Sequence, residues 1–188
     1  KWSRMSELFD VQSLIPGGPE LRARSLELLE FSKVLQALAD HAQTPMSRDR
    51  ILALTPAYSP QAVAELQQET SEAALLIDRS ATLTMSQDPR PYLQRALMQG
   101  VLAGDELVVI ANGLELIRKA KSLGGVERGR TPLLRSMTRA IGDLRGLERL
   151  IRSKLTSSGE LKDEASPMLR QLRRDSRLAY QAASKGLQ

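Results

Sequence analysis

Apolar residues recur every three or four positions along most of this chain, the spacing that places them on one face of a helix. The clearest instance follows Ser166-Pro167. The Ser166 hydroxyl can accept from the unpaired amides of a first turn, and Pro167 suits the first helical position because its missing N–H costs nothing there. The apolar stripe of this helix comprises Leu169, Leu172, Ala179 and Ala183. We therefore predict a helix that begins at Pro167 and meets no stop signal before Gly186.

The same pairing of a capping residue with proline occurs three more times, at Thr44-Pro45, Ser59-Pro60 and Thr131-Pro132. An apolar pattern with helical spacing follows each pair. A phosphorylation site needs no such pattern, so we interpret the pairs as helix starts rather than as sites for a proline-directed kinase.

A first helix is predicted at 20–29. Three further helices are predicted from capping residues that no proline follows. These caps are Ser32, Asp105 and Asp143. In the helix after Ser32, the side chains expected to face the core are those of Val34, Leu35, Leu38 and His41. The helix after Asp105 would end at Gly124-Gly125, and the helix after Asp143 would lead into a turn through 156–159 with a short β-ribbon near 156–163.

The composition favours an all-α fold with a multi-helix core. Aromatic residues make up only 3% of the 188 residues, whereas strands would need more Val, Ile, Tyr and Phe. The pattern predicts an extension or linker at 1–19, which contains Pro16-Gly17-Gly18-Pro19, and a helical core domain at 20–165. The segment 166–188 would be the start of a long helix.

The best functional candidate is a row of arginines in this last helix: Arg170, Arg173, Arg174 and Arg177. Their spacing places four guanidinium groups along one side, and guanidinium forks suit phosphates. The formal net charge of +5 permits nucleic-acid binding. If all four contacted phosphates, the salt slope of duplex binding would be about −3.6. The alternative is an exposed helix face whose arginines pair with Asp or Glu elsewhere.

A second basic group is a weaker candidate, because it lies where a helix would end and cations are favoured there in any case. It comprises Arg118, Lys119, Lys121, Arg128 and Arg130.

Catalytic, cofactor and metal sites are not predicted in this chain. Cysteine is absent and His41 is the only histidine, which makes a zinc site improbable and leaves His41 as a helix-terminal or partly buried side chain. The segment 124–131 has P-loop spacing, but Arg130 stands where the lysine is required, and an amphipathic helix precedes it instead of a buried strand.

Several segments resemble the bacterial MutS-two family, in the order in which they occur there. The strongest is Gly159 to Arg174, with the pattern Gly-Glu-Leu-x-Asp-x-Ala-Ser-Pro-x-Leu-Arg-x-Leu-Arg. The others are Leu29–Val34, Thr44–Arg48, Gln68–Ala73, and Asp88–Pro91 followed by Gly100–Leu102. Two positions depart from the family pattern, which usually has Asp at Ser32 and Gly at Ser47.

The resemblance implies the N-terminal helical core and the start of the lever helix of such a protein. The family is a branch of MutS-like ATPases linked to recombination control and ribosome rescue rather than to mismatch repair. It implies a homodimer that uses ATP and Mg in a downstream domain, often with a C-terminal nuclease domain. DNA, or a ribosome and its RNA, would be the partner. Because this chain begins with Lys1 and lacks the ATPase motifs, we expect a non-enzymatic fragment.

Two functional hypotheses follow. In the first, the chain is the scaffold of a DNA-binding clamp that acts on branched DNA or recombination intermediates. In the second, it is a helical module for dimerisation or for docking on a protein partner or a collided ribosome. No signal peptide or bilayer-spanning apolar run is visible, so we expect a cytoplasmic protein without membrane contact.

Overall fold

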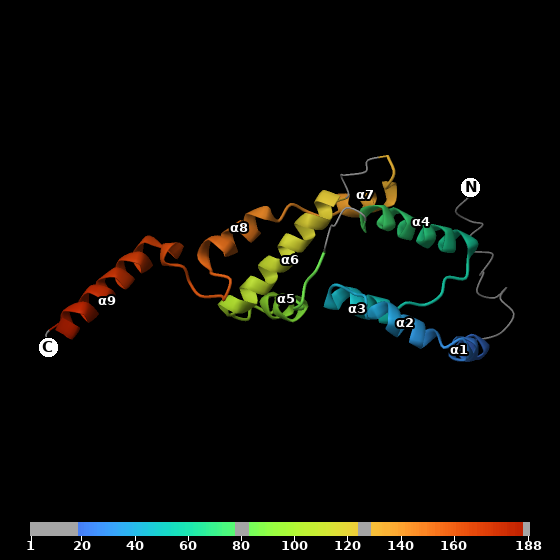
Figure 1. Cartoon of the computed structure of the whole chain (residues 1–188), viewed down its shortest axis with the longest axis horizontal. Coiled ribbons are helices and arrows are strands. Elements are labelled where there is room, and N and C mark those ends of the chain that lie inside the picture. The colour runs from blue at the N-terminus through green and yellow to red at the C-terminus, as the bar shows by residue number, and fades with distance from the viewer. Residues whose placement is uncertain (1–18, 78–82, 124–128, 186–188) are drawn as a thin grey trace. The chain divides into compact units, whose positions relative to one another are not determined.

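The computed structural model describes residues 19–77, 83–123 and 129–185, and these ranges are helical (Figure 1). The α-helices are α1 (Pro19–Leu28), α2 (Phe31–Ala39), α3 (Pro45–Leu52), α4 (Pro60–Ile77), α5 (Arg90–Leu97), α6 (Gly104–Leu123), α7 (Pro132–Arg139), α8 (Arg145–Lys154) and α9 (Pro167–Lys185). A 3-10 turn, η1 (Asp163–Ala165), precedes α9. The predicted all-α fold is therefore confirmed. Within the described ranges, none of the helices combines the length and apolar character that a membrane span requires.

Contacts divide the chain into two compact units. Unit 1 comprises Lys1–Ser86 and Leu123–Ala140, and unit 2 comprises Gln87–Ser122 and Ile141–Gln188. The boundaries predicted at 19/20 and 165/166 remain predictions.

Unit 1 contains α1 to α4 and α7, with α2 packed on α1 and α3, and α4 packed on α7. Two of its predicted helix starts are confirmed. Thr44 and Ser47 form a reciprocal capping box at the start of α3, because the Thr44 hydroxyl accepts from the Ser47 amide at 3.1 Å. The Ser59 hydroxyl accepts from the Ala62 amide, also at 3.1 Å, at the start of α4.

The predicted cap of α2 is wrong, and its predicted core face is correct only at Leu35, which is half-buried. The helix begins at Phe31, after Glu30 in the left-handed region with φ 51°, so Ser32 lies inside the helix. Val34 is 57% exposed and Leu38 48% exposed, whereas Ala39 is fully buried. His41 is also exposed, just beyond the helix end. The more buried face of this short helix runs through Phe31, Leu35 and Ala39, which are spaced four residues apart.

The N-terminus of α7 is capped by a residue from another helix. Thr131 precedes Pro132 as predicted and is fully buried, but its side chain makes no capping hydrogen bond. Instead, the buried Glu72 carboxylate of α4 accepts from the Leu134 amide at 3.0 Å. A carboxylate is favourable there because it satisfies an unpaired amide and complements the helix dipole.

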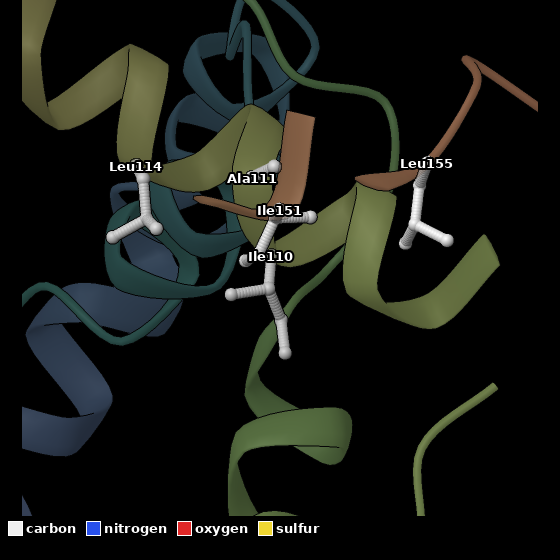
Figure 2. Close-up of a cluster of buried hydrophobic side chains, with 5 residues drawn as sticks. All are labelled: Ile110, Ala111, Leu114, Ile151 and Leu155. Carbon is white, nitrogen blue, oxygen red and sulfur yellow. The ribbon is translucent and has the colours of Figure 1, made fainter. Parts of the chain in front are cut away.

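In unit 2, a cluster of buried apolar side chains forms where α8 lies against α6 (Figure 2). Its buried members are Ile110, Ala111, Leu114, Ile151 and Leu155. The predicted Asp105 cap is two positions late, since α6 begins at Gly104 and its N-cap is therefore Ala103. Glu106 takes the capping role by accepting from the Ala103 amide at 2.9 Å. The predicted end of α6 at Gly124-Gly125 lies outside the described residues.

The predicted turn and ribbon after α8 reduce to a single antiparallel bridge between Leu155 and Leu161. Gly159 closes the turn with φ 86°, in the left-handed region. A Cβ on Gly159 would collide with the backbone of Asp105, so the turn lies directly against the first residues of α6. The ribbon therefore serves to dock the turn on α6 rather than to build a sheet.

Candidate nucleic-acid interface

Helix α9 carries the predicted arginine row and is exposed along most of its length. Its predicted start is confirmed, because the Ser166 hydroxyl accepts from the Leu169 amide at 3.1 Å and Pro167 is the first helical residue. On a helical projection, Arg170, Arg173, Arg174 and Arg177 share one side of this helix.

Two of the four arginines bind one carboxylate. Arg173 donates to the Asp163 carboxylate of η1, and Arg177 donates to the other oxygen of the same carboxylate at 2.6 Å. These hydrogen bonds, first from Arg173 and then from Arg177, hold the pKa of Asp163 below its usual value of 3.8. Asp163 is therefore ionised at neutral pH and keeps the two guanidinium groups in place.

Asp163 is itself fixed by the connection from α8. The Lys162 amide donates to the Lys154 carbonyl at 2.9 Å, and the Lys162 ammonium donates to the Arg152 carbonyl at 2.7 Å. The Lys154 ammonium donates to the Ala165 carbonyl. The base of the arginine row is thus tied to unit 2 by backbone contacts on both sides of η1.

The remaining two arginines, Arg170 and Arg174, are exposed. No carboxylate within the described ranges forms an ion pair with either of them. The row therefore presents two solvated guanidinium groups beside two that share one counterion. Sequence reasoning found all four arginines but missed Asp163, although Asp163 stands in the same motif.

The second basic group is largely engaged within the fold. Arg118 donates to Glu148 at 3.0 Å, Lys119 pairs with Glu115 at 2.9 Å, and Lys121 donates to the Ile141 carbonyl at 2.7 Å. Arg130 is exposed, and Arg128 lies outside the described residues. The hydrogen bonds that Arg118 donates to buried Glu148 are the main cause that raises the pKa of Arg118. Of these cations, Arg118 ties α6 to α8, Lys121 ties α6 to the segment before α8, and Lys119 pairs within α6.

The apolar side of α9 is also exposed. Met168 is 72% exposed and Tyr180 is 77% exposed, and Leu172 and Leu178 are each more than half exposed. A stripe of this kind next to a basic face is typical of a helix that packs against another helix.

The sequence predicts no catalytic, cofactor or metal site, and the contacts described above do not test this expectation. In the described residues, no group of three or more His, Asp or Glu side chains is arranged to hold a metal ion. The P-loop-like segment at 124–131 falls mostly outside those residues, with its last three positions following α6 and leading into α7.

Comparison with known proteins identifies relatives for most of the chain, although no family model matches it. It is 33% identical over 157 residues to endonuclease MutS2 of Symbiobacterium thermophilum, a match that covers 82% of this chain and 20% of the relative. The identity is 33% over 153 residues with endonuclease MutS2 of Pelotomaculum thermopropionicum and 32% over 163 residues with that of Geobacillus kaustophilus. Each of these matches also covers 20% of the relative. The chain therefore spans about one fifth of the length of these relatives, and the resemblance predicted from its motifs is confirmed.

Proposed function

The chain is homologous to a segment of the MutS-two family, and on this premise we propose that it is a helical scaffold that binds nucleic acid through α9. The observation that carries the proposal is the arrangement of the arginine row. Asp163 orders Arg173 and Arg177, while Arg170 and Arg174 face solvent beside them. Because Asp163 offsets part of the charge of Arg173 and Arg177, Arg170 and Arg174 supply most of the attraction for phosphate.

The likeness to MutS-two proteins sets the wider proposal. The full-length protein would be a homodimer that couples this scaffold to an ATPase domain using ATP and Mg, and its activity would lie outside this segment. Branched DNA or recombination intermediates are the proposed partner, in the cytoplasm. The name of the relatives, endonuclease MutS2, agrees with a role on nucleic acid for those proteins. The RNA of a ribosome presents the same phosphate chemistry, so it is the second partner to test.

The test is a titration of the chain against a labelled four-way DNA junction, a plain duplex and a ribosomal RNA hairpin, followed by fluorescence anisotropy at several salt concentrations. The variant Arg170→Gln/Arg174→Gln removes the two solvent-exposed guanidinium groups without touching Asp163. We expect its salt slope to fall by about 1.8, which is two phosphate contacts at 0.9 each.

A matched control removes two exposed arginines from unit 1, in Arg24→Gln/Arg50→Gln. It changes the net charge equally, so equal weakening in both variants would mean that binding follows net charge alone and not α9. Tighter binding to the junction than to duplex or hairpin supports a role in recombination, and tighter binding to the hairpin supports a role on ribosomes. Failure of the wild-type chain to bind any of the three at low salt would overturn the proposal.

A second candidate function rests on the exposed apolar side of α9. Met168, Leu172 and Tyr180 lie on a continuous side of this helix and are each more than half exposed. Such a face favours a helical partner, either a second copy of the protein or another protein, over nucleic acid. Sedimentation analysis of Leu172→Asp distinguishes the two functions, because this change should abolish self-association and leave the salt slope for DNA unchanged.

A further inference from the structure

We propose that the hollow between α6 and the start of α8 in unit 2 is a second phosphate-binding site, which holds the phosphodiester backbone of nucleic acid. The proposal rests on the function proposed above but concerns different residues. Two adjoining cavities of about 390 and 540 Å³ open there and share Arg118, Asp143 and Arg145 in their walls. Lys121 also lines the first cavity, and Arg149 also lines the second.

Positive charge exceeds negative charge in these walls. Four cations line the two cavities, and the only acidic side chains among the lining residues are Asp143 and Glu148. Arg118 and Lys121 belong to the second basic group identified in the sequence. The fold brings Arg145 and Arg149 of α8 to the same place, which their position in the sequence does not predict. An excess of fixed cations around a concave surface raises the local concentration of anions.

The two carboxylates hold the arginines in defined orientations. Glu148 is buried and accepts from the Arg118 Nε at 3.0 Å and from one terminal nitrogen at 3.3 Å. Asp143 binds Arg145 in the same manner, at 3.0 Å through Nε and 2.6 Å through one terminal nitrogen. Within the described residues, the other terminal nitrogen of each guanidinium makes no hydrogen bond, so each keeps donors for a ligand.

Both arginines can be reached from solvent. The side chain of Arg145 is 65% exposed and that of Arg118 is 45% exposed. Glu148 is buried, whereas Asp143 is 54% exposed and is held by its hydrogen bonds to the Arg145 side chain and amide. Fixed guanidinium forks suit tetrahedral phosphate oxygens. A polymer is favoured over a small anion because the cations extend from Lys121 near the end of α6 to Arg149 one turn into α8, across both cavities.

The experiment follows backbone amide signals of the full chain by NMR during titration with a 12-base-pair duplex, and measures affinity by anisotropy. The variant is Arg145→Gln/Arg149→Gln, and the control is Arg24→Gln/Arg50→Gln. We expect the Gly142 and Gly146 amides to shift in the wild type and the control. In the variant we expect these shifts to be lost, the salt slope to fall by about 1.8 and the affinity to drop at least about threefold.

The outcomes separate this proposal from the proposed function. If the Arg145→Gln/Arg149→Gln variant binds DNA as the control does, and only the α9 variant is impaired, the second site is refuted while the proposed function stands. If the wild type binds no nucleic acid, a titration with tripolyphosphate follows. Shifts at Gly146 in that case would identify a small-anion site, and no shifts would identify an ion-paired surface; either result overturns nucleic acid as the occupant. Stronger shifts with a Glu-rich peptide than with DNA would overturn it in favour of an acidic protein.

Discussion

One carboxylate, that of Asp163, limits how much positive charge α9 presents to a ligand. It faces Arg173 and Arg177 and is anchored by the backbone of the α8–α9 connection. Because the two arginines hold its pKa below 3.8, it stays ionised across the whole neutral range, and only a mutation can remove its charge there.

We expect Asp163→Asn to bind duplex DNA about threefold more tightly at low salt, since a surface charge of this kind is worth a few tenths to one kcal/mol. The gain should fade as salt screens it. Anisotropy titrations at two salt concentrations measure the change. Asp175→Asn removes the same charge from the other side of α9, where no arginine of the row lies, and serves as control. Weaker binding by Asp163→Asn would mean that the ordering of Arg173 and Arg177 matters more than their neutralisation.

Replacement of Gly159 by a residue with a side chain should lower the stability of unit 2. Its φ of 86° is costly for any L side chain, by about 1–2 kcal/mol, and an added Cβ would collide with Asp105. We expect Gly159→Ala to lower the free energy of unfolding by at least about 2 kcal/mol in urea denaturation. Gly146→Ala is the matched control, because nothing lies within 4 Å of its added Cβ and it sits in α8. That change should stabilise the protein by up to about 1 kcal/mol. Equal effects would contradict the contact between turn and helix.

At the scale of the helices, local caps could be predicted and distant ones could not. Thr44 and Ser166 were correctly predicted because a cap and its amide lie within three residues. The cap of α7 was not, because Glu72 stands 62 residues before the amide that it binds. No spacing rule connects two positions that only the packing of α4 on α7 brings together.

The pH dependence of the α4–α7 contact follows from this cap. Burial alone would raise the pKa of Glu72, but the Leu134 and Leu133 amides and the Gln68 side chain outweigh it, so the pKa falls below 4.5. A lowered pKa stabilises the folded state above the unfolded value near 4.5, and this contribution is lost as pH falls through the folded pKa. We expect the protection of the Leu134 amide, measured relative to its intrinsic exchange rate at each pH, to fall in acid as the pH drops through the lowered pKa of Glu72.

Glu72→Gln should show low protection of the Leu134 amide at every pH, because a neutral amide is a weaker partner for the helix N-terminus. The Ser47 amide of α3, which a hydroxyl caps, is an internal control that does not depend on a carboxylate. A change at Ser47 that parallels the change at Leu134 would indicate general acid unfolding instead of loss of the cap.

At the scale of the chain, periodicity predicted the all-α class and most helix starts but not which apolar faces are covered. Val34 and Leu38 carry the right spacing and are nonetheless half exposed. Spacing reports that a helix has an apolar side, whereas burial depends on the elements that pack there. The same holds for the arginine row, where spacing aligned the side chains but could not supply Asp163 as their counterion.

The division into two units makes a prediction about cooperativity. Ile151 is buried between α8 and α6 in the core of unit 2 (Figure 2). Truncation of a buried Ile to Ala removes its contacts and leaves a cavity, which costs about 2–5 kcal/mol. Because unit 1 has its own contacts among α1, α2 and α3, we expect Ile151→Ala to raise hydrogen exchange in α6 and α8 and to leave α2 and α3 unchanged. Exchange measured by mass spectrometry on peptides from the two units tests this.

Ala39→Gly in unit 1 is the reciprocal variant, since Ala39 is buried against α3 and should affect only that unit. If either change accelerated exchange in both units alike, the chain would unfold as one cooperative body, and contacts across the unit boundary would contribute as much as those within each core.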